Sequence, residues 1–150
     1  MEIVQNQDQN KNCYLIFSMN EDLYAIKTDF VNEVLSDSVV YPIPFTPNYV
    51  CGLVNRRGTP FTVVDPMVFF NKNEQNSKTL ILLKNLFQDE KESFSVKITD
   101  VLDFFDVDSD TEKKSSETFL WKKKKVKILD ALVIYNKLKQ DFKNIYGGKK

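Results

Sequence analysis

The sequence contains no histidine, two cysteines, four glycines and a single tryptophan among its 150 residues. The lack of histidine excludes Ser-His-Asp and Cys-His nucleophile systems, HExxH zinc sites and phosphohistidine relays. Cys13 and Cys51 are too few soft ligands for a structural zinc site, so we expect no metal and two free thiols in a cytoplasmic protein. Charges interrupt every apolar stretch before the roughly 18 residues that a membrane-spanning helix needs.

Apolar residues make up 42% of the chain, with twelve phenylalanines and six tyrosines, which indicates a packed globular protein. Lysine plus arginine and aspartate plus glutamate both number 21, so the net charge is zero. This balance argues against a general nucleic-acid binder, which is usually clearly basic. The sequence offers no recognisable combination of a general base, a nucleophile and metal ligands, so we expect neither catalysis nor a cofactor.

The chain contains an internal repeat. Residues 24–35, YAIKTDFVNEVL, align without gaps on residues 94–105, FSVKITDVLDFF. Residues 61–71, FTVVDPMVFFN, align in the same way on residues 126–136, VKILDALVIYN. Because each copy begins with a strand pair joined by a polar turn, we predict a mainly β fold. It would consist of two small SH3-like five-stranded barrels related by this duplication, with short helices.

The two copies are predicted to form two subdomains of one domain. Residues 13–76 make the first, and residues 77–146 make the second together with a closing helix, leaving flexible tails at 1–12 and 147–150. Apolar residues at steps of three and four after Asp130 predict that the closing helix is amphipathic and covers the core. These apolar residues are Ile134, Leu138, Phe142 and Ile145.

Asp65 and Asp130 end the two matching strands. A catalytic pair is one interpretation, but each residue stands where a helix N-cap belongs, and Pro66 suits a first helical position. We therefore expect both carboxylates to accept hydrogen bonds from backbone N–H groups. Short helix-like turns are also expected at about 28–35 and 99–105.

The stretch GLVNRRG reads as a tight turn between two strands. Gly58 is predicted to supply a positive φ, Gly52 a bulge or close backbone approach, and Asn55 a further structural position. Arg56 is expected to be a solvated turn residue. Arg57 is interpreted as a partner contact, because arginine is enriched among interface anchors. Phosphate binding is the rival use, but it normally adds further glycines or a helix N-terminus.

These motifs resemble the chemotaxis coupling protein family CheW. YLIFSMNEDLYAIKTDFVNEVL and IPFTPNYVCGLVNRRGTPFTVVDPMVFF contain that family's Y-x-I strand end, V-x-E-V/I segment, I-P-x-T-P, N-x-R-G turn and V-D strand end. The resemblance is dense over residues 13–71, moderate over 78–106 and weak after 106. In the last part, FLWKKKKVKILD replaces the usual second hairpin with its glycine.

The resemblance implies a non-catalytic adaptor that couples the cytoplasmic tips of chemoreceptors, the methyl-accepting chemotaxis proteins, to the regulatory domain of the histidine kinase CheA. It also implies a cytoplasmic location, peripheral to membrane-bound receptor arrays, without direct membrane insertion and without nucleic acid. The receptor-binding residues that it implies are Val31, Glu33, Val101, Phe104 and Arg57. The kinase-binding residues that it implies are Val40, Ile43, Pro44, Phe45 and Arg57.

Several interpretations stay open at this point. One sequence does not separate buried from exposed apolar positions. Val31 and Val101 could therefore be core residues and not receptor-binding residues, which is the simpler interpretation. A protein of a different class, a small-barrel nucleic-acid-binding protein, would use Arg56, Arg57 and the run Lys122–Lys125. The same lysine run is either a solvated hairpin turn or a basic patch for acidic lipid or an acidic partner.

Overall fold

The computed structural model describes residues 11–84, 93–108 and 117–144. Within these ranges no helix is long and apolar enough to cross a membrane. The strands are β1 (Lys11–Met19), β2 (Asp22–Lys27), β3 (Val31–Leu35), β4 (Val50–Arg56), β5 (Thr59–Val64), β6 (Thr79–Leu83), β7 (Phe94–Ile98), β8 (Asp100–Asp108), β9 (Thr118–Trp121) and β10 (Lys124–Ile128). The helices are the 3-10 turn η1 (Thr28–Phe30), the short α2 (Pro66–Phe69) and α4 (Ala131–Phe142).

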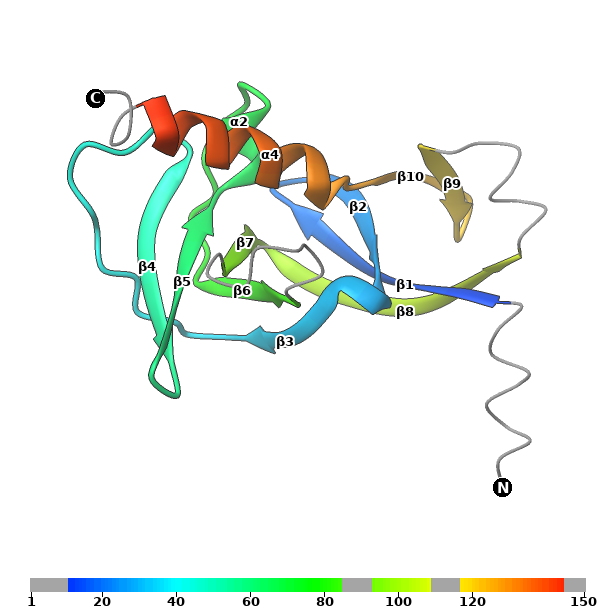
Figure 1. The fold of residues 1–150 in the computed structure, drawn as a ribbon. Coiled ribbons are helices and arrows are strands. Elements are labelled where there is room, and N and C mark those ends of the chain that lie inside the picture. The colour runs from blue at the N-terminus through cyan, green and yellow to red at the C-terminus, as the bar shows by residue number, and fades with distance from the viewer. Residues whose placement is uncertain (1–10, 85–92, 109–116, 145–150) are drawn as a thin grey trace.

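The strands form two five-stranded sheets (Figure 1). Sheet A has the order β8-β1-β2-β10-β9, and sheet B has the order β3-β6-β7-β5-β4. Neighbouring strands are antiparallel except for one parallel pair in each sheet, β2 with β10 and β5 with β7. The mainly β fold predicted from the sequence is confirmed.

The internal repeat is visible in the order of the strands. When β1–β5 are matched in turn with β6–β10, the two sheets have the same order, and the parallel pair occupies the same place in both. The two sequence matches align β2 and β3 with β7 and β8, and β5 with β10. The prediction of two five-stranded units built on one plan is therefore confirmed.

The two copies exchange strands. Sheet A combines β1 and β2 with β8, β9 and β10, whereas sheet B combines β3, β4 and β5 with β6 and β7. The division predicted at residues 13–76 and 77–146 therefore does not coincide with the sheets, because each sheet draws on both halves. β1 begins at Lys11, inside the predicted tail 1–12, and the rest of both predicted tails lies outside the described residues.

β1 is buried on both faces because it separates two hydrophobic cores. Leu15 and Phe17 contact the large core that lies between the sheets and α4, whereas Tyr14 and Ile16 contact a smaller core within sheet A. The equivalent strand β6 divides its side chains in the same way, between the large core and a small core within sheet B. This arrangement explains why both strands read as nearly continuous apolar runs.

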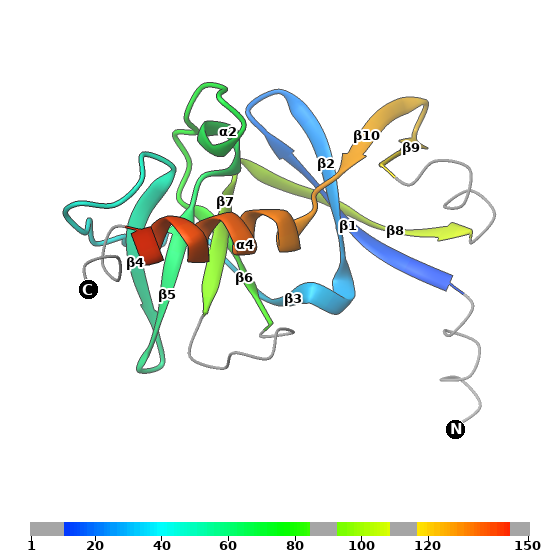
Figure 2. The same ribbon diagram turned by 45° about the horizontal axis from the view of Figure 1, so that its top comes forward.

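α4 lies across the strands of sheet B in Figure 2, its buried side chains belong to the large core, and both helix caps are those predicted. Asp130 Oδ1 accepts hydrogen bonds from the backbone N–H groups of Leu132 and Val133, at 3.1 and 3.4 Å. Asp65 Oδ1 accepts from Met67 N at 3.0 Å, at the start of α2. The buried residues of α4 are Ala131, Ile134, Tyr135 and Leu138, and Phe142 packs against the same core. The predicted Ile145 lies outside the described residues.

The helix-like turns expected at about 28–35 and 99–105 are largely wrong. Only Thr28–Phe30 forms a helical turn, and the remaining residues form the edge strands β3 and β8. Valine and phenylalanine, which fit a pleated surface well, are frequent in both segments. Pairing with β6 and with β1 therefore takes precedence over local helix formation.

Candidate functional site

Arg57 and Gly58 form the two-residue turn between β4 and β5. Their φ angles are 53° and 84°, and Arg56 pairs with Thr59 on either side, as in a type I′ turn. Gly58 N donates a hydrogen bond to Asn55 Oδ1 at 3.0 Å. This turn follows the natural twist of the strands, and the exposed Arg57 lies at the tip of the hairpin.

Gly52 lies where two backbone segments meet closely. Its φ is 146°, and a Cβ atom at this position would lie 2.2 Å from the carbonyl oxygen of Tyr41. Tyr41 and Leu53 exchange two backbone hydrogen bonds of 2.8 Å at this point, and the pairing of β4 with β5 shifts register between Val50 and Gly52. Only glycine fits here, and it fixes the segment before β4 against the sheet.

Arg56 is engaged with Glu33 in a bidentate ion pair. Arg56 Nε donates to Glu33 Oε1 at 3.1 Å, and Nη2 donates to Oε2. The hydrogen bonds from Arg56 are the main cause that lowers the pKa of Glu33, and the nearby charges of Arg56 and Arg57 lower it further. The expectation that Arg56 is only a solvated turn residue is wrong. The sequence alone does not reveal this contact, because 23 residues separate the partners and the turn chemistry does not require it.

The residues expected on the receptor side lie on the two equivalent edge strands, β3 and β8. Val31 is half-buried and packs against the large core, while Glu33 is held by Arg56. Val101 and Phe104 are 40% and 63% exposed on β8. Leu102, which sequence reasoning missed, is 43% exposed between them. It has no cross-strand partner, because β8 shifts register against β1 at this point.

The residues expected on the kinase side lie in the segment between β3 and β4 and differ in exposure. Val40 is half-buried and packs against the small core of sheet B, and Ile43 is also half-buried. Pro44 is exposed, and Phe45 is 83% exposed with a positive φ of 61°. A bulky side chain is uncommon in that backbone conformation. The segment therefore displays an aromatic ring to solvent although its backbone conformation is unfavourable.

Two further apolar residues of this segment are exposed and were missed by sequence reasoning. Val39 and Tyr41 are each 62% exposed, on either side of the half-buried Val40. The backbone is extended at Tyr41, which bridges to Leu53 of β4, so neighbouring side chains point to opposite sides. Val39, Val40 and Tyr41 are consecutive apolar residues, so the sequence itself carries no signal that separates the exposed pair from Val40.

The end of this segment is linked to the last turn of α4. Tyr49 Oη donates to Asp141 Oδ2, and Lys137 Nζ donates to Asp141 Oδ1 at 2.8 Å. Burial and the hydrogen bond to Asp141 raise the pKa of Tyr49 above its ordinary value. The hydrogen bonds from Lys137 and Tyr49 lower the pKa of Asp141. The helix that covers the core thus also fixes the chain beside the exposed apolar segment.

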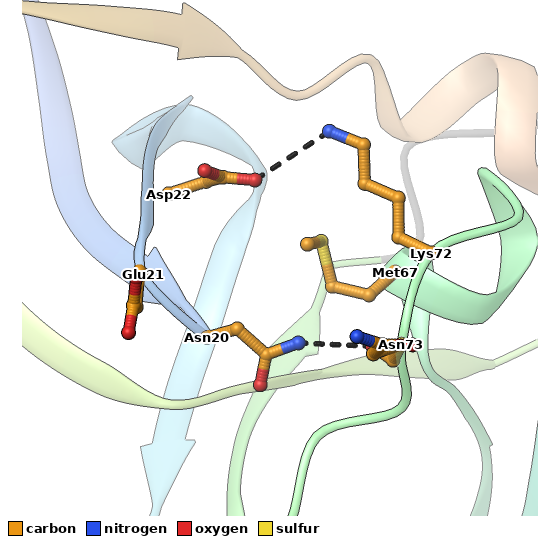
Figure 3. Close-up of a pocket in the computed structure, with 6 residues that line it drawn as sticks. All are labelled: Asn20, Glu21, Asp22, Met67, Lys72 and Asn73. Atoms are coloured by element: carbon orange, nitrogen blue, oxygen red, sulfur yellow. Dashed lines mark hydrogen bonds and ion pairs between the residues drawn. The ribbon is translucent and has the colours of Figure 1, made fainter.

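An open cavity of about 670 Å³ lies between the β1–β2 hairpin and the loop after α2 (Figure 3). Lys72 Nζ lies 3.5 Å from Asp22 Oδ2, and Asn20 Nδ2 donates to Asn73 O at 2.9 Å. Met67 lies between these two contacts in Figure 3. Both polar contacts link sheet A to the α2 loop, so the lining residues have a structural use.

The buried carboxylate of Asp65, the N-cap residue of α2, is used in structural hydrogen bonds. Asp65 is 2% exposed, and it accepts from Met67 N and from the backbone and side-chain nitrogens of Gln75. Thr99 Oγ1 donates to Gln75 Oε1 at 2.9 Å and accepts from Asn20 N at 2.8 Å. This network joins both sheets to the connecting loop, and it supports the N-cap interpretation of Asp65 over a catalytic one.

The described residues contain no group of three or more histidine, cysteine, aspartate or glutamate side chains that could hold a metal ion. Cys13 and Cys51 are free and half-buried, and burial is the main cause that raises the pKa of both thiols. Both thiols are therefore protonated near neutral pH and are poor nucleophiles.

The cationic residues of the nucleic-acid alternative do not form one surface. Figures 1 and 2 show the β4–β5 hairpin, which contains Arg56 and Arg57, at one end of the molecule, and the β9–β10 hairpin, which contains Lys122–Lys125, at the other. Arg56 is moreover paired with Glu33. A continuous basic groove, which single-stranded nucleic acid needs, is thus not built from these residues.

The two five-stranded sheets, which exchange strands, define a small-barrel domain. Its exposed apolar side chains, on an edge strand and on a loop, are surfaces typical of a protein-binding module. A family model described as the CheW-like domain matches residues 13–130. The chain belongs to the CheW family.

The fold is also that of a solved CheW structure. The crystal structure of the scaffolding protein TtCheW from Thermoanaerobacter tengcongensis matches with a TM-score of 0.68 and 21% sequence identity. This match covers 80% of the present chain and 89% of that chain. A comparison with curated protein sequences gives no match. Members of the family are non-catalytic scaffold proteins of chemotaxis, and the family assignment supports that class for this chain.

Proposed function

We propose that this protein is an adaptor that couples chemoreceptor tips to the regulatory domain of the histidine kinase CheA. In this proposal it works in the cytoplasm at membrane-bound receptor arrays, and it acts by holding its partners. Membership of the CheW family supports the class of adaptor. The two partners and most of the residues proposed to bind them are those that the resemblance to this family implies, and the exposed surfaces described above are consistent with them.

The observation that carries the proposal is the presence of two separate exposed apolar patches. An adaptor needs two surfaces that two partners can occupy together, and apolar side chains that cluster on a surface commonly mark such sites. The strand patch, on β8, consists of Val101, Leu102 and Phe104. The loop patch, between β3 and β4, consists of Val39, Tyr41 and Phe45.

The strand patch is proposed to bind the receptor. A receptor tip is a helical hairpin, and an amphipathic helix binds by placing its apolar residues on an apolar surface. Phe104 is the most exposed residue of this patch and serves as the anchor. Val31 and Glu33 are proposed to border the same site from β3, with the Glu33 carboxylate held in place by Arg56.

The loop patch is proposed to bind the kinase regulatory domain. Phe45 holds its ring in solvent with a left-handed backbone, a conformation that costs a non-glycine residue about 1 kcal/mol. Such strain is commonly maintained at functional sites. Pro44 is proposed to contact the kinase beside Phe45, whereas the half-buried Val40 and Ile43 support the loop from below.

Substitutions that separate the two patches test the proposal. We expect Phe104→Ser to weaken binding of a chemoreceptor cytoplasmic fragment at least tenfold and to leave binding of the CheA regulatory domain unchanged. Phe45→Ser should have the opposite selectivity. Val133→Ser is a matched control, because Val133 is 52% exposed on α4, outside both patches. Titration calorimetry with each partner, and a three-way pull-down with both, measure these effects.

The outcome also shows which part of the proposal fails. If both variants bind both partners as tightly as the native chain, the assignment of the patches is wrong. If the native chain binds neither partner, the coupling function itself is wrong. Circular dichroism melts of all three variants verify that each protein is folded.

A further inference from the structure

The β9–β10 hairpin has a concentration of positive charge that the proposed adaptor function does not use. Lys122, Lys123, Lys124, Lys125 and Lys127, which we call the hairpin lysines, are all exposed. The whole chain is neutral, but residues 118–150 contain ten lysines and two aspartates, whereas residues 1–117 contain nineteen acidic and eleven basic residues. The neutral total therefore conceals a strongly basic C-terminal part, and charge asymmetry of this kind is typical of proteins that bind anionic surfaces.

The two faces of this hairpin differ sharply. Phe119, Trp121 and Val126 are buried in the small core of sheet A, with exposed fractions of at most 7%. On the opposite face Leu120 is 67% exposed and lies directly across from Lys125, with Lys127 two residues further along β10. Side chains directly opposite each other in an antiparallel pair lie about 5 Å apart. The outer face thus places an exposed leucine beside two lysines.

The turn of the hairpin adds two more lysines at its tip. Lys122 and Lys123 have φ angles of 49° and 65°, so a two-residue turn with both residues in the left-handed region forms without glycine. Lys122 Nζ lies 5.0 Å from the centre of the Trp121 ring, which holds this ammonium close to the hairpin. The lysines are therefore presented by a short, well-packed hairpin.

We propose that this outer face binds an anionic lipid surface. Lysines close to an anionic bilayer are attracted to its headgroups, and an exposed leucine among them can enter the interfacial layer. Nucleic acid would satisfy the lysines but has no comparable place for Leu120, and arginine, the commonest reader of phosphate and bases, is missing from the hairpin. A lipid surface fits both the charge and the leucine.

The position of the hairpin allows this contact to coexist with a partner on the loop patch. In Figures 1 and 2 the hairpin lies at one end of the molecule, and β4 and β5 lie at the other end. The loop patch is next to β4, to which Tyr41 bridges. A flat surface can therefore reach the hairpin without covering the loop patch. Lipid binding of this kind is peripheral and does not depend on either proposed protein partner.

Vesicle flotation with the full chain tests the proposal. We expect binding to vesicles of phosphatidylglycerol mixed with phosphatidylcholine, and none to vesicles of phosphatidylcholine alone. Each lysine near an anionic surface contributes about fivefold to the partition coefficient, so Lys125→Gln with Lys127→Gln should lower it about thirtyfold. The matched control is Lys78→Gln with Lys84→Gln, which removes the same charge from two exposed positions that flank β6 and should have little effect.

Leu120→Ser separates lipid from other polyanions. It should weaken vesicle binding while it leaves retention on a heparin column unchanged. The proposal is wrong if the hairpin and control variants lose equal affinity, or if phosphatidylcholine vesicles bind equally well. It is also wrong if single-stranded DNA binds more tightly than the anionic vesicles and Leu120→Ser changes neither, which would indicate a nucleic-acid site instead.

Discussion

Trp121 donates a hydrogen bond from its indole Nε1 to Asp103 Oδ2 at 2.9 Å, and this contact joins the two edge strands of sheet A. In sheet B the ion pair of Arg56 with Glu33 joins the edge strands β3 and β4. The repeat aligns Glu33 with Asp103, and it places Arg56 and Trp121 at the same position before their two-residue turns. Each sheet is therefore closed into a barrel at the equivalent position. The acceptor is an equivalent carboxylate in both sheets, but the donor is an indole in sheet A and a guanidinium group in sheet B.

The Asp103 contact should matter for stability, because the indole N–H that it satisfies is buried. Asp103→Ala leaves Trp121, which is 7% exposed, without this acceptor, and we expect a loss of about 1–3 kcal/mol in the free energy of unfolding. Asp103→Asn retains an oxygen acceptor and should cost much less. Urea titrations followed by the emission of Trp121, the single tryptophan, measure both. Equal stability of the two variants would contradict this role.

The ion pair that closes sheet B predicts a pH dependence. The pKa of Glu33 is lowered by Arg56 from its ordinary value of 4.5, so the pair stabilises the folded state fully above that pH. This stabilisation is lost as the pH falls through the lower pKa of the folded state. We therefore expect the destabilisation caused by Arg56→Gln to be greatest near neutral pH and to shrink below about pH 4.5. Chemical denaturation at several pH values measures it, with Arg57→Gln as the control, which should have a smaller effect.

The turn at Lys122 and Lys123 should be improvable with glycine. Lys123 has a φ of 65°, which costs an L-residue with a side chain about 1 kcal/mol relative to glycine. We expect Lys123→Gly to raise the free energy of unfolding by about that amount. In the equivalent turn Gly58 has a φ of 84° with open space around it, so Gly58→Ala should cost a similar amount through backbone strain alone. Thermal melts that change in the same direction for both variants would refute the prediction.

The link from Tyr49 to Asp141 should hold the end of α4 in place. Tyr49→Phe removes one hydrogen bond to a carboxylate that is partly accessible to solvent, so we expect a loss of about 1 kcal/mol. Lys137 and Tyr49 lower the pKa of Asp141 from its ordinary value of 3.8. The stabilisation is therefore complete above that pH and disappears as the pH falls through the folded-state value. Hydrogen exchange of the last turn of α4 should accelerate in Tyr49→Phe near neutral pH, and unchanged protection there would show that core packing alone holds the helix.

Arg57 is expected to act in binding and not in folding. It lies exposed at the tip of the β4–β5 turn, next to the ion pair of Arg56. Arg57→Ala should weaken assembly with receptor and kinase by about 1–3 kcal/mol, the range for an interface anchor. Its melting temperature should stay close to that of the native chain, and Lys84→Ala, at another exposed cation, provides the control for binding. Unchanged affinity for both partners would reduce Arg57 to a turn residue.

Exposure within the candidate sites could be predicted only in part. The alternation of side chains in extended backbone is a local property, and it separates the half-buried Val40 from the exposed Val39 and Tyr41 once that segment is known to be extended. The CheW-like motifs instead implied that Val40 binds the kinase. Val31 and Val101 are equivalent in the repeat, yet Val31 packs against the large core and Val101 is 40% exposed. This difference depends on what other elements cover each strand.

The sequence by itself determined the features that depend on neighbouring residues. Strand alternation, the repeat, the aspartate caps of α2 and α4 and the apolar face of the last helix all follow from contacts within a few positions along the chain. Tertiary structure alone decided which strands share a sheet and which side chains join the sheet edges. The exchange of strands between the copies and the pairing of Glu33 with Arg56 connect distant residues. Such pairings are selected by burial of the shared core, and that free energy belongs to the whole fold and not to any local pattern.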